Sequence, residues 1–594
     1  MSNKYLHHPL DVKNIILSRD QIKKDILSSR SDFLDKKIAI LGGSTTSELI
    51  HFLDIFLLSA GIKGTFYESD YGKYMEEAIF DNKNLTKFSP DIIYIHTTAK
   101  NIDKFPDFDF SESDTLSLAK EEIKKYTSIW KSLDNLNALI IQNNFELPKF
   151  RTLGNIDAVD HRGRVSFTNK LNSLLLQEIV SHKGVYLNDI NYLSSLIGLS
   201  NWHDNRLWFA YKYAASFHGL VFLAQNLKKI ISAAFGANKK NLVLDLDHTL
   251  WGGVIGDDGL EKIKIGEDGS VGESFKDFQL ELKRLKDSGI LLSIASKNEM
   301  ENASLGLSHP EGILAEEDFV SIKANWEPKD QNIQLMSNEI SLGLDSFVFL
   351  DDNPVERSLV RENLPTVSVP EIGNDPNHYF EFIDQEGYFE RTTLAEDDLD
   401  RSRYYSENQE RNTVEAKFKS QEEFLKSLNM EAKITFFDEM SLERITQLIN
   451  KTNQFNLTTK RYSIKEVLQL KVSQNFYAFY GRLADKFGDN GLISVLIAKL
   501  DGNSLLIDSW LMSCRVLKRG MEFAMFNFLL DIAYKNDIQS IKGTFLPTDR
   551  NKMVENLYLD IGFELISESN EGFVYEFKIG KDRSDLTHFI SVID

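Results

Sequence analysis

The chain has 594 residues, more than one compact core usually holds, so about three or four domains are expected. Hydrophobic residues make up 42% of the chain and charged residues 26%, a balance typical of globular rather than disordered proteins. The net charge of −21 disfavours nucleic acid and anionic membranes as partners, and neither a signal peptide nor an apolar stretch of membrane-span length is evident. We therefore expect a cytoplasmic protein.

Three apolar runs in the N-terminal part predict buried parallel strands. They begin at Lys37 (KKIAILGGSTTSEL), Asp91 (DIIYIHTT) and Ala138 (ALIIQNNFELP), with helical patterns between them, and this alternation predicts an α/β domain over residues 1–230. The Gly-Gly-Ser after the first run resembles the Gly-Asp-Ser block of SGNH hydrolases, with Ser44 in the nucleophile's place. No Asp-x-x-His block follows, so we expect an SGNH-like accessory domain that docks a partner.

A second alternating pattern, over residues 241–372, predicts a parallel-sheet α/β domain with phosphate chemistry. Its first strand leads into Asp245 and Asp247, which are two residues apart and so face the same way. One carboxylate can attack phosphorus while the other protonates the leaving oxygen and later deprotonates water. Carboxylates that face a phosphate also need a cation, and Mg²⁺ is the natural one for oxygen ligands.

Further polar residues follow the next strands of this domain. Ser296 and Lys297 come just after GILLSIA, and they could bind phosphate oxygens together with Thr249. Lys329, in ANWEPKD, could offset charge on the nucleophile and the phosphoryl group. Because ligands of open α/β sheets bind at the carboxyl ends of strands, we expect these side chains to meet.

A pair of acids after the last strand, SFVFLDD, completes the pattern. Four carboxylates are the expected metal ligands: Asp245, Asp247, Asp351 and Asp352. The order Asp-x-Asp-x-Thr, Ser, Lys and paired Asp resembles the haloacid dehalogenase (HAD) superfamily. That resemblance implies a magnesium-dependent phosphatase in which Asp245 is the nucleophile and Asp247 the acid/base.

A narrower resemblance covers nearly everything after Lys240. LDLDHTLWGGVIGDDGL, NWEPKDQNI and FLDDNPVER are similar to the FkbH-like branch of the superfamily, as are NQFNLTTKRYS (from Asn453) and DKFGDNGLISV (from Asp485). The family resemblance implies a bifunctional glyceryl transferase and phosphatase. Such an enzyme takes 1,3-bisphosphoglycerate, removes its phosphates and loads D-glycerate as a thioester on an acyl carrier protein.

Beyond a helical linker expected over residues 373–413, residues 414–594 mix helices with antiparallel-looking strands, which indicates an α+β domain. Asp501-Gly502 predicts a hairpin turn between two of these strands. Cys514, the only cysteine, ends an apolar strand just before a basic turn and an amphipathic helix. Nearby cations and the positive end of a helix favour a thiolate, which would attack an acyl phosphate.

The basic turn, Arg-x-Leu-x-Arg-Gly, resembles the pyrophosphate loop of the GNAT acetyltransferases, which use coenzyme A. Its expected phosphate-binding residues are Arg515, Arg519 and Gly520. Coenzyme A and carrier proteins share the phosphopantetheine group, so a GNAT-like domain with a cysteine suits acyl exchange with a carrier. Glu522 stands where the acetyltransferase pattern has a small residue, which speaks against the use of acetyl-CoA.

Several assignments stay open in the C-terminal part. Five polar residues could bind glyceryl hydroxyls or simply cap helices: Asn453, Asn456, Thr458, Asp489 and Asn490. No histidine stands in a telling motif near Cys514, and Asp489 is one candidate for its base. The alternatives are a stand-alone phosphatase with an appended binding domain, a non-catalytic docking subunit and an acetyltransferase.

Overall fold

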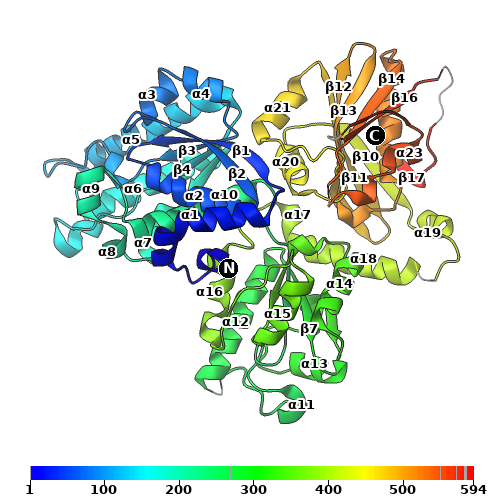
Figure 1. Ribbon diagram of the computed structural model, residues 1–594, viewed down its shortest axis with the longest axis horizontal. Coiled ribbons are helices and arrows are strands. Elements are labelled where there is room, and N and C mark those ends of the chain that lie inside the picture. The colour runs from blue at the N-terminus through cyan, green and yellow to red at the C-terminus, as the bar shows by residue number, and fades with distance from the viewer. Residues whose placement is uncertain are drawn as a thin grey trace. The chain divides into compact units, whose positions relative to one another are not determined.

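The computed structural model describes residues 2–267, 269–415, 417–548, 550–569, 572–580 and 585–593. The chain forms two compact units, Met1–Ala233 with Ser463–Glu466, and Ala234–Tyr462 with Val467–Asp594 (Figure 1). Among the described helices, none combines the length and the apolar character needed to cross a membrane.

The first unit is built on a parallel five-stranded sheet of order β2-β1-β3-β4-β5. The strands are β1 (Leu34–Gly42), β2 (Ile62–Glu68), β3 (Ile92–His96), β4 (Leu139–Asn143) and β5 (Val185–Asn188). The longer helices are α1 (Val12–Ser29), α2 (Ser47–Ser59), α5 (Glu112–Leu133), α6 (Arg164–Ser181) and α10 (Phe217–Ala234), and the shorter ones are α3 (Tyr74–Ile79), α4 (Lys83–Phe88), α7 (Ile190–Leu196), α8 (Leu199–Trp202) and α9 (Asn205–Tyr211). The three predicted strands are β1, β3 and β4. All residues of β3 and β4 are buried, which explains why these runs are apolar throughout.

The second unit begins with a parallel four-stranded sheet of order β8-β7-β6-β9. Its strands are β6 (Asn241–Leu244), β7 (Leu291–Ser296), β8 (Phe319–Ala324) and β9 (Phe347–Leu350). The helices are α11 (Ile255–Asp258), α12 (Ser270–Asp287), α13 (Met300–Leu307), α14 (Lys329–Glu339) and α15 (Pro354–Asn363). Apolar clusters fill both faces of the sheet, one with Phe275, Phe278 and Leu282 of α12 and the other with Ile333 and Met336 of α14. The two faces of the sheet are thus covered by apolar side chains, and the polar residues that follow the strands lie where the strands end.

The predicted linker, residues 373–413, is helical but is not a free connection. It contains α16 (Tyr379–Glu386), α17 (Glu396–Leu399) and most of α18 (Arg401–Glu415). Tyr379 and Ile383 are buried in the same core cluster as Phe278, so α16 belongs to the four-stranded domain. Because this segment contains many acidic residues, its apolar face was not evident from the sequence.

The C-terminal part forms a mixed eight-stranded sheet of order β15-β16-β14-β13-β12-β11-β10-β17. Its strands are β10 (Met430–Phe436), β11 (Phe476–Asp485), β12 (Gly488–Asp501), β13 (Ser504–Met512), β14 (Ser540–Phe545), β15 (Glu564–Ser569), β16 (Gly572–Lys578) and β17 (Ile590–Ile593). The helices are α19 (Gln421–Ser427), α20 (Leu442–Lys451), α21 (Ile464–Val472), α22 (Met521–Lys535) and α23 (Leu557–Ile561). The predicted hairpin joins β12 to β13, and Gly502 adopts a φ of +60° in its turn. The α+β class agrees with the sequence prediction.

Candidate active sites

The predicted acidic cluster forms at the carboxyl edge of the four-stranded sheet. Asp245 follows β6, and Asp351 and Asp352 follow β9, its neighbour in the sheet. One carboxylate oxygen from each of the three lies within 4.8 Å of the others. Asp245 and Asp351 are buried and Asp352 is half-buried. Three converging carboxylates of this kind can hold a divalent cation with oxygen ligands.

Lys329 is the cation of this cluster. It begins α14, is 3% exposed, and places Nζ 2.9 Å from Asp245 Oδ1 and 2.6 Å from Asp351 Oδ2. Burial opposes its charge, but the two carboxylates outweigh burial and raise the pKa of Lys329. Burial raises the pKa of Asp351 to about 7, with repulsion from Asp245 adding to the effect and Lys329 opposing it. The pKa of Asp352 is also raised, first by burial and then by Asp245. One ammonium therefore does not balance the three acids.

Asp247 was predicted as one of four metal ligands, but its carboxylate lies outside the cluster that the other three acids form. Its Oδ1 accepts hydrogen bonds from Trp251 Nε1 at 2.8 Å and from Ile255 N at 3.0 Å, and its Oδ2 accepts one from Asn298 Nδ2 at 3.0 Å. His248 adopts a left-handed φ of +58°, which turns the chain so that these donors can reach Asp247. Burial still raises the pKa of Asp247, which suits a group that delivers a proton.

The three predicted phosphate-binding residues of this domain differ in their surroundings. Thr249 is fully buried, and its Oγ1 has no hydrogen-bond partner among the described residues. Ser296 is the last residue of β7 and is 2% exposed. The side chain of Lys297 instead pairs with Glu356 Oε1 at 2.6 Å, so its ammonium is already engaged. Thr249 and Ser296 are thus the better placed for a phosphate oxygen.

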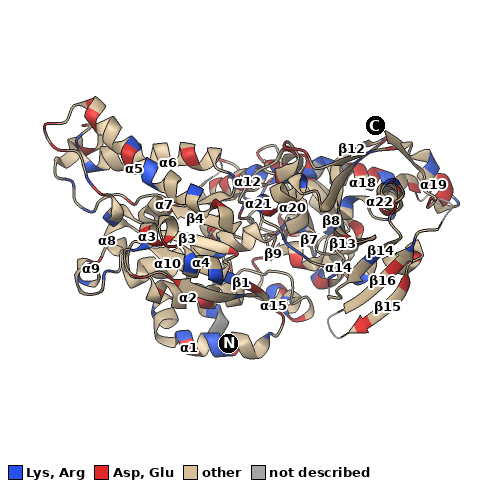
Figure 2. Cartoon of the chain, turned by 90° about the horizontal axis from the view of Figure 1, so that it is seen from above, with Lys and Arg blue, Asp and Glu red and all other residues tan. Residues whose placement is uncertain are grey.

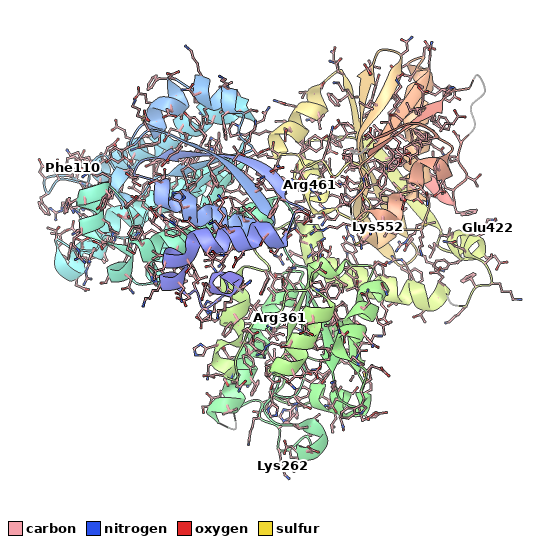
Figure 3. All side chains as sticks on the ribbon, in the orientation of Figure 1. Phe110, Lys262, Arg361, Glu422, Arg461 and Lys552 are labelled. Atoms are coloured by element: carbon pink, nitrogen blue, oxygen red, sulfur yellow. The ribbon has the colours of Figure 1, made fainter. Side chains whose placement is uncertain are left out.

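The segment between Asp247 and α12 is a short flap. Gly252 and Lys264 pair as an antiparallel bridge, and α11 lies between them. Lys262 marks the outer end of this segment (Figure 3). The flap is far smaller than a domain, so a group that protrudes from a larger molecule could reach the acids.

Cys514 lies at a different place, where β13 ends and a short 3₁₀ turn begins. It is half-buried, and its Sγ is 3.9 Å from Tyr405 Oη. Burial raises the pKa of Tyr405 well above its usual range, and the nearby thiol adds to this, so its hydroxyl stays protonated and can donate. The 8%-exposed Arg515 stacks on Tyr404, with 4.3 Å from its guanidinium carbon to the ring centroid.

Arg519 was predicted to bind phosphate in the basic turn, but its guanidinium is engaged by other side chains. Its guanidinium donates to Asp485 Oδ2 at 3.0 Å and to Asn408 Oδ1 at 2.7 Å, inside a buried network. Gly520 lies at the start of α22 with a φ of +82°. Of the three predicted residues, Arg515 is the one that lies beside Cys514.

The five candidate glyceryl-binding residues do not gather around one site. Asn453 lines the cavity next to Cys514. The side chains of Asn456 and Thr458 donate hydrogen bonds to the main-chain oxygens of Thr452 and Asp508, respectively. Asn490 Oδ1 lies 3.4 Å from the Arg519 guanidinium. All three side chains thus have structural contacts. Asp489 pairs with Arg482 at 3.4 Å and does not line that cavity, so the structure does not place it as a base for Cys514.

Comparisons with known proteins agree with this geometry. Residues 37–232 match the family model described as FkbH, N-terminal domain. The structure is similar to the N-terminal part of a Bacteroides fragilis protein containing a phosphatase domain complexed with Mg, at 27% identity and a TM-score of 0.57, over 63% of this chain and 98% of that one. The chain is thus similar to FkbH over its N-terminal domain and to a protein with a magnesium-bound phosphatase domain over 63% of its length.

Two acetyltransferase structures match a smaller part of the chain. PaiA N-acetyltransferase from Thermoplasma acidophilum is 14% identical, with a TM-score of 0.21, over 25% of this chain and 99% of its own. A GNAT-family acetyltransferase from Streptococcus pneumoniae is 13% identical, with a TM-score of 0.21, over 25% of this chain and 100% of its own. No curated protein matches the sequence.

Three residues of the acidic site were not predicted from the sequence. Asn298 and Trp251 donate to Asp247, as described above. Arg357 donates to the carbonyl oxygens of Asp351 and Asp352, at 2.7 Å each, and thereby fixes the turn that carries both acids. Asn298 is two residues beyond Ser296, and this spacing at a strand end was a usable signal.

Proposed function

We propose that this FkbH-like chain is a magnesium-dependent phosphatase coupled to an acyl transferase. The observation that carries the proposal is the cluster of Asp245, Asp351 and Asp352, with Lys329 paired to the two buried acids Asp245 and Asp351. The proposed overall reaction converts 1,3-bisphosphoglycerate to a D-glyceryl thioester on an acyl carrier protein, with the acyl unit passing through Cys514.

The phosphatase step uses the acids at the carboxyl edge of the sheet. Asp245 Oδ attacks phosphorus, and Lys329 offsets the charge that the carboxylate and the phosphoryl group bring together. Asp247, whose raised pKa favours its protonated form, gives its proton to the leaving oxygen and then takes one from water. Asp245, Asp351 and Asp352 would hold Mg²⁺, which when bound neutralises and orients the phosphate. The Mg complex of the Bacteroides fragilis relative supports this choice of ion.

The transferase step uses Cys514, which attacks the carbonyl carbon of an acyl phosphate. Lys240, Asp345 and Ser346 line the cavity at Cys514, and they directly precede β6 and β9. The acids directly follow the same two strands. Lys240 and Asp245 are five residue steps apart, at about 3.3 Å each, so roughly 16 Å of sheet lies between the two sites. An acyl unit bound to Cys514 therefore cannot reach Asp245, whereas one on a flexible phosphopantetheine arm could visit both edges.

The test is intact-mass measurement and phosphate release after incubation with 1,3-bisphosphoglycerate. Because Cys514 is the only cysteine, one thiol-linked acyl adduct is expected in the wild type and none in Cys514→Ser. Asp245→Asn should keep the adduct on Cys514, and once the acyl carrier protein is added it should leave the remaining phosphate on the carrier-bound acyl unit, whereas the wild type and the exposed matched control Asp287→Asn should remove it. Phosphate release without any adduct on Cys514 would favour a stand-alone phosphatase with an appended binding domain.

A further inference from the structure

The cavity beside Cys514 is strongly cationic. Its volume is ≈ 90 Å³, and it lies within the second unit between the amino edge of the four-stranded sheet and the end of β13. Five of its lining residues carry cationic groups: Lys240, Arg401, Arg444, Lys451 and Arg515. Asp345 is the one carboxylate among the described lining residues. Elsewhere on the described chain, cations and acids are interspersed (Figure 2), so this imbalance is local.

One guanidinium nitrogen of Arg515, which lines this cavity, has no acceptor among the described residues. The residue is 8% exposed, and its Nε donates to Ser513 Oγ at 3.2 Å. Its Nη2 is buried and has no hydrogen-bond partner in the part of the chain that the structure describes. A buried, charged N–H without an acceptor is unfavourable, so this group is prepared for an anion that enters the cavity.

The two lysines of the cavity are also short of negative charge. The pKa of Lys451 is lowered to about 8, mainly by burial, with Arg401 and Arg444 adding to the effect and Asp398 opposing it. Burial is likewise the main cause of the lowered pKa of Lys240. Asp398 is already shared, because it pairs with Arg401 and lies 3.5 Å from Lys451 Nζ. An anion in the cavity would relieve this repulsion.

We propose that the cavity binds the phosphate of an acyl phosphate donor, with Arg515, Lys240 and Lys451 as its ligands, and so presents the acyl carbon to Cys514. This inference rests on the proposed function and adds the subsite that selects the donor. A volume of ≈ 90 Å³ suits a phosphate-sized group and is far below the roughly 300–1,000 Å³ of pockets that enclose drug-sized ligands. The phosphopantetheine arm of an acceptor must then approach Cys514 from outside.

The transfer step balances with these groups alone. The Cys514 sulfur forms a bond to the acyl carbon, and the bond between that carbon and the phosphate oxygen breaks. The phosphate leaves with the electron pair and takes up the thiol proton, so hydrogen phosphate is the product. The cations hold the phosphate as its charge increases, and Tyr405 Oη can donate to the sulfur at 3.9 Å.

The experiment measures alkylation of the single thiol by iodoacetamide in the full-length protein, followed by intact mass. We expect inorganic phosphate to slow alkylation of Cys514, compared with chloride at the same ionic strength. In Arg515→Gln and in Lys451→Gln the phosphate concentration that halves the rate should rise roughly tenfold, as for one lost charge-assisted hydrogen bond. The exposed Lys499→Gln is the matched control and should behave like the wild type.

Phosphate that leaves the alkylation rate unchanged in the wild type would overturn the subsite, and so would equal protection in the wild type and both variants. The readout needs no acyl transfer, so failure of the proposed function is separate from failure of this inference. Phosphate protection without an acyl adduct keeps the anion site and removes the transferase. An acyl adduct without phosphate protection keeps the transferase and removes this site.

Discussion

Replacing Lys329 by Met tests the electrostatic balance of the acidic cluster. The two side chains have similar length and volume, so Lys329→Met removes the charge with little change in packing. The variant leaves Asp245 and Asp351 buried without the ammonium that lies 2.9 and 2.6 Å from them. Removing one partner of a buried ion pair costs about 3–5 kcal/mol.

The cost should depend on pH in a direction that the structure fixes. The folded-state pKa of Asp351 is about 7, raised from an ordinary 3.8, so its protonated form contributes stability below pH 3.8 that is lost as pH rises through 7. Without Lys329 that pKa rises further. At pH 5 Asp351 carries its proton in both proteins, so only the lost pairing with Asp245 remains and the difference in the free energy of unfolding is smaller than at pH 8. At pH 8 the difference should approach about 3 kcal/mol.

The assay is amide hydrogen exchange of peptides from β6 and β9 with EDTA present, because exchange reports the stability of this domain separately from the rest of the chain. Adding Mg²⁺ should restore much of the lost protection in Lys329→Met, since the ion supplies positive charge to the same acids. The control is Lys323→Met, whose surface pair with Glu339 is worth about 1 kcal/mol or less. Unchanged protection of β6 and β9 in Lys329→Met at pH 8 would refute this electrostatic account.

Three further changes probe other parts of the chain. Asn298→Ala removes a donor to Asp247, so phosphate release should fall about tenfold, and the alkaline limb of its pH–rate profile should move to higher pH. Burial raises the pKa of Glu146 from 4.5 to about 7, so its ionised form destabilises the first unit. Glu146→Gln should therefore stabilise this unit by about 3 kcal/mol at pH 8 and by nearly nothing at pH 4.5, which thermal unfolding can measure. Asp485→Asn unbalances two buried arginines, so exchange of β11 and β12 should show a loss of about 3–5 kcal/mol while phosphate release at the other site persists.

The acidic site was largely predictable because its residues follow strands. Each apolar run marked a strand, and parallel strands bring their carboxyl ends to one edge, so Asp245, Asp351 and Lys329 could be placed together before any coordinates. The side-chain direction of Asp247 could not. It depends on the left-handed turn at His248 and on donors that only the folded flap supplies.

The surroundings of Cys514 were predicted less well. Local sequence pointed to Arg515 and Arg519 as phosphate-binding residues of the turn beside the thiol, and of these two only Arg515 lines the cavity at Cys514. The Arg519 guanidinium instead donates a hydrogen bond to Asp485, which is 34 residues away in the chain. The cations that replace it come from other elements, such as Lys451 at the end of α20. Contacts between residues so far apart along the chain produce no periodic pattern in a single sequence.

The separation of the two sites and the small flap point to one kind of substrate. A substrate free in solution would gain from a lid that excludes water, and residues between Asp247 and α12 are too few to form a lid domain. A substrate carried on a long arm gains nothing from such a lid, because the arm must enter and leave. Strand β6 runs from the cavity at Cys514 to Asp245, so in the proposed reaction the arm of the carrier, and not the protein, would supply the motion that links acyl capture to phosphate removal.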